Sequence, residues 1–370
     1  MPDVKNTSTL TAVIVLAAGA GTRMKSETPK VLHKVLGLPL VEHVLLAAAP
    51  ANARDTVVVV GHGREQVIAQ LDGSNPNIST VVQEQQNGTG HAVGIALNAL
   101  EDTAQGSVVV LAGDTPLLTS QDIVGLAQAQ AGIAATVLTA SISDATGYGR
   151  IIRNSDGDVE SIVEHRDASD EQLLIHEVNS GVYCFDIALL RDALTRIGTA
   201  NDQGEQYLTD VVEILRADGH VVRAVETTEE NILGVNDRRQ LAEAGAILRK
   251  RILDEWMLSG VTMVDPGSTW IDRSVALEPD VELLPNVTLQ GQTHVSTGAT
   301  IGPDCTLNNT EVRSGANVTR TTAKDAVIGE RATVGPYTYL RPGTVLGAGA
   351  KAGGFVEIKN SQLGDNAKVP

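Results

Sequence analysis

The chain has 370 residues, a formal net charge of −17 at a sequence pI near 4.8, and 42% hydrophobic but only 2% aromatic residues. This length predicts two domains, and the acidic balance excludes general attraction to nucleic acid or anionic membranes. The sequence has no apolar run of about 18 residues, and residues 1–10 lack the apolar core of a signal peptide. Its two cysteines, Cys184 and Cys305, suggest no disulfide framework. We therefore expect a cytoplasmic protein with no membrane partner.

The first predicted strand, 12–16, runs into a glycine-rich turn at 17–21, which is followed by Arg23 and Lys30. Glycines allow backbone N–H groups to approach an anion, and the two cations suit a polyphosphate. A Walker A loop is absent, and Met24 replaces the third glycine of a dinucleotide fingerprint. The whole string, L-x-x-G-x-G-T-R-M-x-x-x-x-P-K, resembles the signature of sugar-1-phosphate nucleotidylyltransferases; the alternative is a structural turn.

Short apolar runs at 57–60, 108–111 and 136–140 alternate with helical stretches such as 121–131. This alternation predicts a Rossmann-like α/β domain with a mostly parallel sheet and its ligands at the carboxyl ends of the strands. Gly113-Asp114 follows one of these strands, so we expect it near the glycine-rich turn.

Two polar residues are candidates for a Mg²⁺ site. Asp114 could hold the ion against phosphate oxygens, although a single Asp before Pro116 is more often a cap. Asn236 could add an amide oxygen, although alone it suits the N-cap of the following helix. Their joint presence favours the metal site.

The segment QEQQNGTGHA, 83–92, contains a predicted turn. Gln83 offers a donor and an acceptor to a pyrimidine edge, and Gly88 and Thr89 allow the backbone to approach the base. For His91 we favour a structural role, because an attacking phosphate is already anionic and needs no general base.

Further polar residues follow glycine-containing turns. Glu164 and Asn179 lie near predicted strand ends and suit sugar hydroxyls and an N-acyl amide. Each taken alone would be a surface polar residue, but their order along the chain favours a sugar pocket.

The pattern then changes twice. Apolar residues spaced three or four apart predict a connecting helix, and we place the domain boundaries at 1–238, 239–259 (linker helix) and 260–370. In the last domain aliphatic residues recur every six positions in two phases: Leu277, Leu283, Leu289, Val295, Ile301 and Leu307, then Ile328, Val334, Leu340 and Leu346. A strict spacing of six residues predicts a parallel β-helix of hexapeptide repeats; chance periodicity and a β-sandwich are the alternatives.

Taken in order from about Ala12 to the last residue, these motifs resemble the bacterial family of bifunctional N-acetylglucosamine-1-phosphate (GlcNAc-1-phosphate) uridylyltransferases and glucosamine-1-phosphate N-acetyltransferases. The resemblance implies Mg²⁺-dependent transfer of UMP from UTP to GlcNAc-1-phosphate, giving the cell-wall precursor UDP-GlcNAc and pyrophosphate. The implied nucleotide contacts are Leu16, Ala17, Ala18, Gly19, Lys30, Gln83, Gly88, Thr89, Ala112, Gly113 and Asp114. The implied catalytic residues are Arg23, Lys30 and Asp114; the metal ligands are Asp114 and Asn236; and the sugar contacts are Gly149, Glu164, Asn179, Thr209 and Asn236. Ala112 departs from the family, in which some members have an aromatic residue before Gly-Asp.

The second half resembles the family's left-handed β-helix acetyltransferase domain, in which Arg341 and Lys359 match amino-sugar phosphate contacts. The family's catalytic His is expected immediately after Pro370, so we expect a C-terminally truncated chain without acetyltransferase activity. Acetyl-CoA would then serve only the intact protein. The resemblance also implies a homotrimer.

Two other readings stay open. Non-catalytic regulators share this domain combination, but they are disfavoured by the joint presence of Lys30, Asp114 and Asn236. An enzyme for another sugar phosphate, such as glucose-1-phosphate, is disfavoured by the pairing of Glu164 with Asn179.

Overall fold

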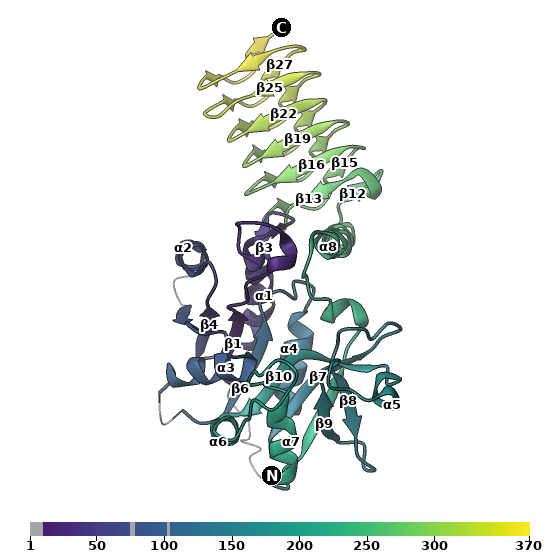
Figure 1. Cartoon of the computed structure of the whole chain (residues 1–370). Coiled ribbons are helices and arrows are strands. Elements are labelled where there is room, and N and C mark those ends of the chain that lie inside the picture. The colour runs from purple at the N-terminus through teal and green to yellow at the C-terminus, as the bar shows by residue number, and fades with distance from the viewer. Residues whose placement is uncertain (1–9, 75–77, 102–103) are drawn as a thin grey trace, which may run out of the picture. The chain divides into compact units, whose positions relative to one another are not determined.

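The computed structural model describes residues 10–74, 78–101 and 104–370, and it divides into two compact units (Figure 1). One unit runs to His33 and then from Pro39 to Ala244; the other contains 34–38 and Gly245–Pro370. Helix α8, Arg238–Leu258, lies where the apolar spacing predicts a connecting helix. The domain boundaries drawn from the sequence stay predictions.

The first unit contains a nine-stranded sheet with the order β11-β7-β10-β6-β1-β4-β5, in which β8 also pairs with β10 and β9 pairs with β8. The strands are β1 (Leu10–Ala17), β4 (Asp55–Val60), β5 (Ser79–Val82), β6 (Ser107–Ala112), β7 (Ala135–Ser141), β8 (Arg150–Arg153), β9 (Val159–Val163), β10 (Glu177–Asp186) and β11 (Val222–Glu226). β6, β1, β4 and β5 are parallel, whereas β10 is antiparallel to both β6 and β7. The predicted α/β domain is therefore confirmed, with β10 and β9 as exceptions to its parallel order, since β8 is antiparallel to both.

Helices cover both faces of this sheet. They are α1 (Leu40–Ala48), α2 (Arg64–Ser74), α3 (Thr89–Asn98), α4 (Ser120–Ala129), α5 (Asp170–Leu173), α6 (Ile187–Leu194) and α7 (Asp210–Ala217), with short 3-10 turns at Thr22–Met24, Lys30–Leu32, Ala49–Ala51 and Glu229–Ile232. One core packs α3, α6 and α7 on the sheet, and a second core packs α1, α2 and α4. Because both faces are buried, β1, β4 and β6 consist of continuous aliphatic runs.

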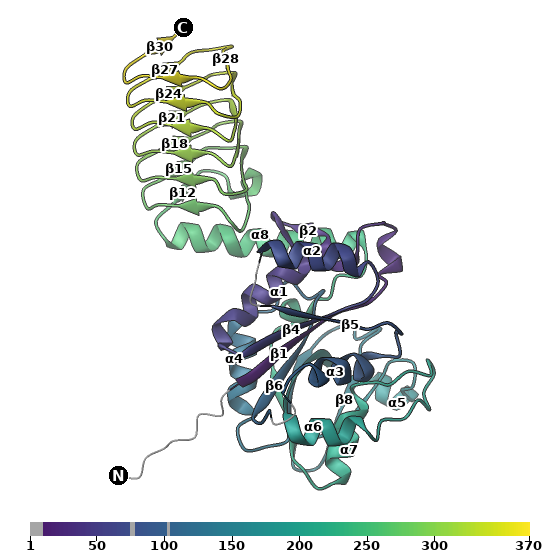
Figure 2. The ribbon, with the colours of Figure 1, turned by 90° about the vertical axis from the view of Figure 1, so that its left-hand side faces the viewer.

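The second unit is a left-handed parallel β-helix, whose stacked coils are plain in Figure 2. Its three flat faces are sheets. The first contains β12 (Thr262–Met263), β15 (Glu282–Leu283), β18 (Thr300–Ile301), β21 (Asn317–Val318), β24 (Thr333–Val334), β27 (Lys351–Ala352) and β30 (Lys368–Val369). The second contains β13 (Trp270–Ile271), β16 (Val287–Gln290), β19 (Cys305–Asn308), β22 (Thr321–Lys324), β25 (Thr338–Leu340) and β28 (Glu357–Ile358). The third contains β14 (Ala276–Leu277), β17 (His294–Val295), β20 (Glu311–Val312), β23 (Val327–Ile328), β26 (Val345–Leu346) and β29 (Gln362–Leu363).

The two phases of the six-residue repeat have a structural cause. All ten aliphatic residues of the predicted repeat are buried in one core. Leu289 pairs with Leu307, 18 residues on, but Leu307 pairs with Ala323, only 16 residues on. The coils return to 18 residues where Leu340 pairs with Ile358. Shortened coils between 307 and 328 thus shift the phase without interrupting the β-helix.

A short hairpin from the N-terminal part of the chain belongs to the second unit. It is formed by β2 (Lys34–Val35) and β3 (Leu38–Pro39). Leu36 accepts a 3.0 Å backbone hydrogen bond from Arg273, and a Cβ on Gly37 would lie 2.8 Å from the Asp272 carboxylate. The glycine therefore allows the hairpin to approach the first coil closely. Within the described ranges, no helix is both long enough and apolar enough to cross a bilayer.

Candidate active site

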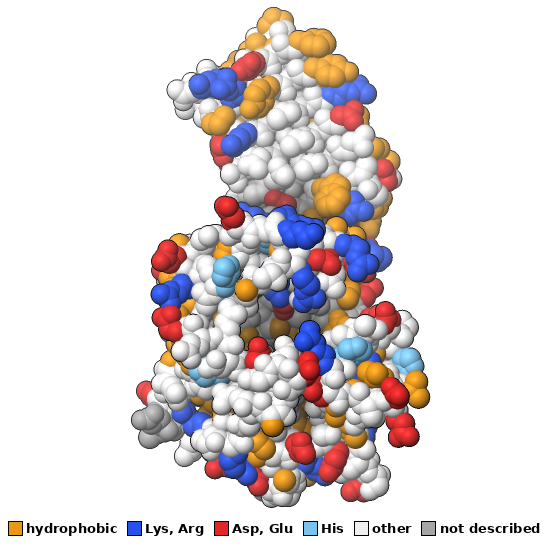
Figure 3. Space-filling model, in the orientation of Figure 1, with side chains coloured by type: hydrophobic (Ala, Val, Ile, Leu, Met, Phe, Trp, Pro, Cys, Tyr) orange, Lys and Arg blue, Asp and Glu red, His pale blue; other side chains and the backbone are white. Residues whose placement is uncertain are grey.

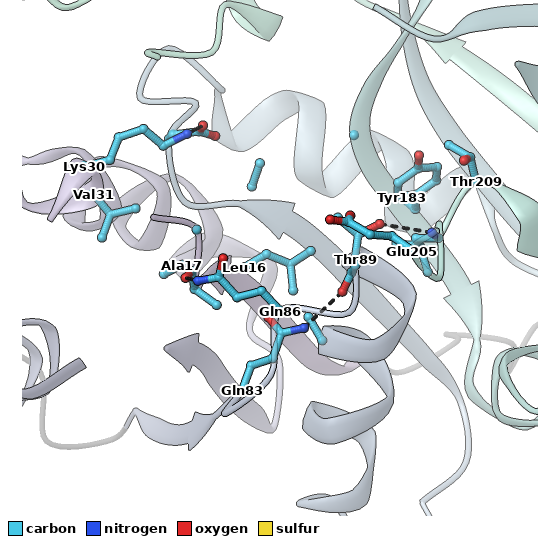
Figure 4. A pocket seen from close by; sticks show the side chains of 18 of the residues that line it. Leu16, Ala17, Lys30, Val31, Gln83, Gln86, Thr89, Tyr183, Glu205 and Thr209 are labelled. Carbon is cyan, nitrogen blue, oxygen red and sulfur yellow. Dashed lines mark hydrogen bonds and ion pairs between the residues drawn. The ribbon is translucent and has the colours of Figure 1, made fainter. Parts of the chain in front are cut away.

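A cavity of about 390 Å³ opens at the carboxyl ends of β1 and β6 in the first unit (Figure 4). Thirteen of the predicted site residues line it: Leu16, Ala17, Ala18, Gly19, Lys30, Gln83, Gly88, Thr89, Ala112, Asp114, Glu164, Asn179 and Thr209. Lys30 lies at one end of the view and Tyr183 with Thr209 at the other. The motifs that the sequence proposed separately for phosphate, base and sugar therefore share one pocket.

The glycine-rich turn after β1 brings Lys30 to the pocket. Gly21 has a φ of +60°, and a Cβ built on it would lie 2.5 Å from the Cβ of Lys30. A side chain at this position would thus be strained and would also collide with Lys30. Gly113, after β6, donates a 2.9 Å hydrogen bond to the Leu16 carbonyl, which fixes the second loop beside the first.

Two cationic side chains and two side-chain oxygens meet next to this turn. Lys30 forms an ion pair with Asp114, and its Nζ lies 3.3 Å from the Asn236 Oδ1. Arg23 donates a 2.9 Å hydrogen bond to the same amide oxygen. The Val235 N–H donates to the Asp114 carbonyl at 2.8 Å, which draws Asn236 toward Asp114. The structure thus brings together the two residues predicted to bind metal, although Arg23 and Asn236 do not line the cavity itself.

Gln83 is buried beneath the predicted base site. Its Nε2 lies 3.1 Å from both the Gly88 carbonyl and the His91 Nδ1. Because the amide nitrogen is occupied by these two acceptors, Gln83 can offer the pocket only its carbonyl oxygen. His91 thereby acts on the orientation of Gln83, in agreement with the structural role favoured from the sequence.

A loop from 201 to 208 packs against the same motif. A Cβ on Gly88, whose φ is +104°, would lie 2.4 Å from the Gln206 carbonyl oxygen. The Gly90 N–H donates to that oxygen at 2.8 Å, and Leu208 donates to the Thr89 Oγ1 at 3.0 Å. These bonds join the base end of the pocket to its sugar end.

Four of the five predicted sugar contacts, Gly149, Glu164, Asn179 and Thr209, gather at the other end, whereas Asn236 lies beside Lys30. Asn179 on β10 donates a 2.9 Å backbone hydrogen bond to Gly149, and Thr209 donates a 3.3 Å hydrogen bond to the Glu164 Oε1. Burial raises the pKa of Glu164, an effect that the Thr209 hydroxyl partly offsets and nearby Asp167 and Asp210 reinforce. The environment therefore favours protonation of this carboxyl more than water does.

Arg341 and Lys359 lie in the other unit, on successive coils. Arg341 follows β25 and Lys359 follows β28, which are paired, and the Arg341 N–H donates to the Ile358 carbonyl at 2.8 Å. The guanidinium of Arg341 also donates a 2.8 Å hydrogen bond to Glu357. The two predicted acetyltransferase contacts are thus neighbours on one face of the β-helix.

Seven pocket residues were not predicted from the sequence, and three of them have polar side chains: Gln86, Glu205 and Tyr183. Gln86, which donates a 2.8 Å hydrogen bond to the Ala18 carbonyl, lies inside the quoted motif and could have been found there. Glu205 lies in a loop without a periodic pattern. Tyr183 belongs to the run VYCF, which is indistinguishable from an ordinary buried strand.

A family model described as nucleotidyl transferase matches residues 12–272 of the chain. Among curated proteins, the "Bifunctional protein GlmU" of Streptomyces coelicolor is 53% identical over 363 residues, covering 97% of this chain and 75% of the relative. The proteins of the same name from Pseudarthrobacter chlorophenolicus and Corynebacterium aurimucosum are 51% and 50% identical, again over 97% of this chain and over 74% and 75% of their own lengths.

Proposed function

The chain belongs to the nucleotidyl transferase family and to the bifunctional GlmU proteins, and on this premise we propose how its pocket works as a uridylyltransferase. The reaction transfers UMP from UTP to GlcNAc-1-phosphate and yields UDP-GlcNAc and pyrophosphate. The observation that carries the assignment of roles is the single cavity that joins Lys30 and Asp114 to Gln83 and to Glu164.

The base end suits uracil. The carbonyl oxygen of Gln83 is the part of its amide left for the ligand, and it can accept from the uracil N3–H. Gly88 is the N-cap of α3 and Thr89 is its first residue, and both line the cavity together with Gln83. Cytosine has an acceptor at N3 instead of a donor, so the same oxygen would disfavour it.

The family is consistent with a divalent metal requirement, and we propose Mg²⁺ as the ion. Asp114 and Asn236 fit it, because their oxygens converge on one cation, the Lys30 ammonium. One carboxylate and one amide oxygen are the kind of small protein contribution that Mg²⁺ takes at phosphate sites, where substrate phosphates supply further ligands. When bound there, Mg²⁺ would polarise phosphate oxygens and neutralise their charge.

Positioning and charge neutralisation account for the reaction. A phosphate oxygen of GlcNAc-1-phosphate forms a bond to the α-phosphorus of UTP as the bond to the pyrophosphate oxygen breaks. Arg23 and Lys30 would neutralise charge on the departing pyrophosphate. Glu164, Asn179 and Thr209 would hold the sugar at the opposite end of the cavity, in line with the phosphates.

The test is pyrophosphate release from UTP, GlcNAc-1-phosphate and Mg²⁺, with glucose-1-phosphate in a parallel reaction. Fast, Mg²⁺-dependent release with the GlcNAc substrate alone supports the proposal. Equal release with both sugars would contradict the sugar assignment, and release with neither would point to the non-catalytic alternative.

We also propose a homotrimer in the cytoplasm. Exposed hydrophobic side chains gather on the last coils of the β-helix (Figure 3). Phe355 and Tyr337 are 84% and 55% exposed and stack at 5.1 Å, an apolar surface that self-association would cover. Both cysteines are free thiols, which suits a reducing compartment. Sedimentation equilibrium tests the assembly.

The relatives are called bifunctional, and for the intact protein we propose amino-sugar acetylation with Arg341 and Lys359 as phosphate contacts. The sequence-based prediction that these 370 residues transfer no acetyl group stays a prediction. Acetylation of glucosamine-1-phosphate by the purified chain, with acetyl-CoA present, would contradict it.

A further inference from the structure

Tyr183 places a buried hydroxyl at the sugar end of the pocket. The side chain is only 2% exposed, yet it lines the cavity. Its ring is fixed by stacking on Phe185, with the centroids 5.3 Å apart. In Figure 4 the hydroxyl lies beside Thr209, at the opposite end of the view from Lys30. A rigid phenol in this position can act directly on the sugar.

The direction of its hydrogen follows from the neighbouring hydrogen bonds. The Gly181 backbone N–H can only donate, so the atom of Asn179 that it contacts at 3.0 Å is the carbonyl Oδ1. The Asn179 Nδ2 must then be the atom that lies 2.7 Å from the Tyr183 hydroxyl oxygen. Because Nδ2 donates in that contact, the phenol accepts there, and its own hydrogen must point to another acceptor.

Within the described parts of the chain, no residue accepts this hydrogen. The nearby Glu164 carboxylate accepts from Thr209 and makes no hydrogen bond with Tyr183. Burial raises the pKa of the Tyr183 phenol, so the hydroxyl keeps its proton at neutral pH. A buried donor without a partner is costly, and such a donor facing a substrate pocket is suited to a substrate oxygen.

We propose that the Tyr183 hydroxyl donates a hydrogen bond to the acyl carbonyl of the N-acetylamino sugar and so selects acylated sugar phosphates. This inference rests on the proposed uridylyltransferase function. The carbonyl is the matching partner because it is the strongest neutral acceptor on the sugar and does not itself donate, whereas each hydroxyl also needs an acceptor. A site that hydrogen-bonds one substrate group discriminates against the analogue that lacks it.

The experiment compares Tyr183→Phe with Tyr207→Phe. Tyr207 is a matched control: it is 8% exposed, its hydroxyl accepts a 2.8 Å hydrogen bond from Gln203, and it does not line the cavity. We expect Y183F to lower kcat/KM for GlcNAc-1-phosphate about tenfold through KM, with KM for UTP and kcat/KM for glucose-1-phosphate unchanged. Y207F should resemble the unsubstituted chain in all three values.

The same substitution made in an Asn179→Ala chain distinguishes direct contact between Tyr183 and the sugar from positioning of Asn179 by Tyr183. If Tyr183 acted only by holding Asn179, Y183F would cost nothing further in an N179A chain; we expect KM for GlcNAc-1-phosphate to rise again there. An unchanged KM in that background, or equal losses with both sugar phosphates, would overturn the proposal. Failure of the proposed function is distinct, because the unsubstituted chain would then release no pyrophosphate with GlcNAc-1-phosphate.

Discussion

Arg23 and Asn236 lie 213 residues apart in the chain and are joined by a 2.9 Å hydrogen bond from Nη2 to Oδ1. Lys30 reaches the same amide oxygen and pairs with Asp114. Each oxygen proposed to bind the metal therefore faces a cation proposed to bind phosphate. The two halves of the proposed catalytic centre are thus held together by contacts within the protein, which is the preorganisation that electrostatic catalysis requires.

Asp114→Ala should remove Mg²⁺-dependent turnover. The substitution deletes the only carboxylate of this cluster, so we expect kcat to fall about a thousandfold and Mn²⁺ binding, measured by electron paramagnetic resonance, to weaken. Asp156→Ala, in an exposed turn, is the matched control and should leave both unchanged. Retained Mg²⁺-dependent activity in D114A would remove Asp114 from the metal site.

Gln83→Ala should weaken the discrimination between UTP and CTP. The variant loses the buried carbonyl oxygen that would accept from uracil, so KM for UTP should rise about tenfold while CTP is little affected. Gln85→Ala, on the exposed part of the same motif, provides the comparison. An unchanged ratio of kcat/KM for UTP over CTP in Q83A would show that Gln83 does not read the base.

Glu164 should make folding stability depend on pH. Its pKa is raised by burial above the ordinary 4.5, so the folded chain binds this proton more tightly than the unfolded chain. Its contribution to the free energy of unfolding is then fully present below pH 4.5 and is lost as the pH rises through the folded-state pKa. Urea unfolding at stepped pH should show a decline that Glu164→Gln removes. A decline of the same size in E164Q would assign it to other groups.

Local chemistry along the sequence predicted most of the fold. Residues that are buried form visible patterns in the sequence. Examples are the aliphatic runs of β1, β4 and β6 and the six-residue spacing of Leu283, Leu289 and Val295. The antiparallel direction of β10 could not be predicted, because a strand buried on both faces has the same apolar pattern in either direction. The shortened coils were also hidden, since Ala323 occupies an inward position with a small side chain.

Some residues of the candidate site could likewise be predicted from the sequence, and others could not. Gly21 and Asp114 could be found because the glycine-rich turn and Asp114 directly follow strands, where ligands of a parallel sheet are expected. Asn236 could be found because a polar residue follows an apolar pair, Ile232-Leu233, although the structure has a 3-10 turn at Glu229–Ile232 and not a strand. Tyr183 could not, because its role depends on the Asn179 amide and on Gly181, which define its hydrogen-bond direction only in three dimensions. Motifs identify residues that contact a ligand through a local loop, whereas contacts contributed by a core strand need the fold.

Gly21→Ala should impair catalysis by displacing Lys30. The glycine has a φ of +60°, which costs about 1–2 kcal/mol for a residue with a Cβ. That Cβ would also lie 2.5 Å from the Cβ of Lys30, so either the turn or Lys30 must move. If Lys30 binds phosphate as proposed, its displacement by about 1 Å should lower kcat by about a hundredfold, measured by pyrophosphate release.

Gly19→Ala separates this collision from loss of glycine in general. A Cβ on Gly19 meets no atom within 4 Å, so the chain should fold with unchanged stability in urea and keep Lys30 in place. If Gly19 faces the nucleotide as proposed, KM for UTP should rise while kcat changes little. The two glycines of one turn would then affect different kinetic constants. Equal effects on kcat in both variants would show that the turn acts as a whole, and the specific contact between Gly21 and Lys30 would lose its support.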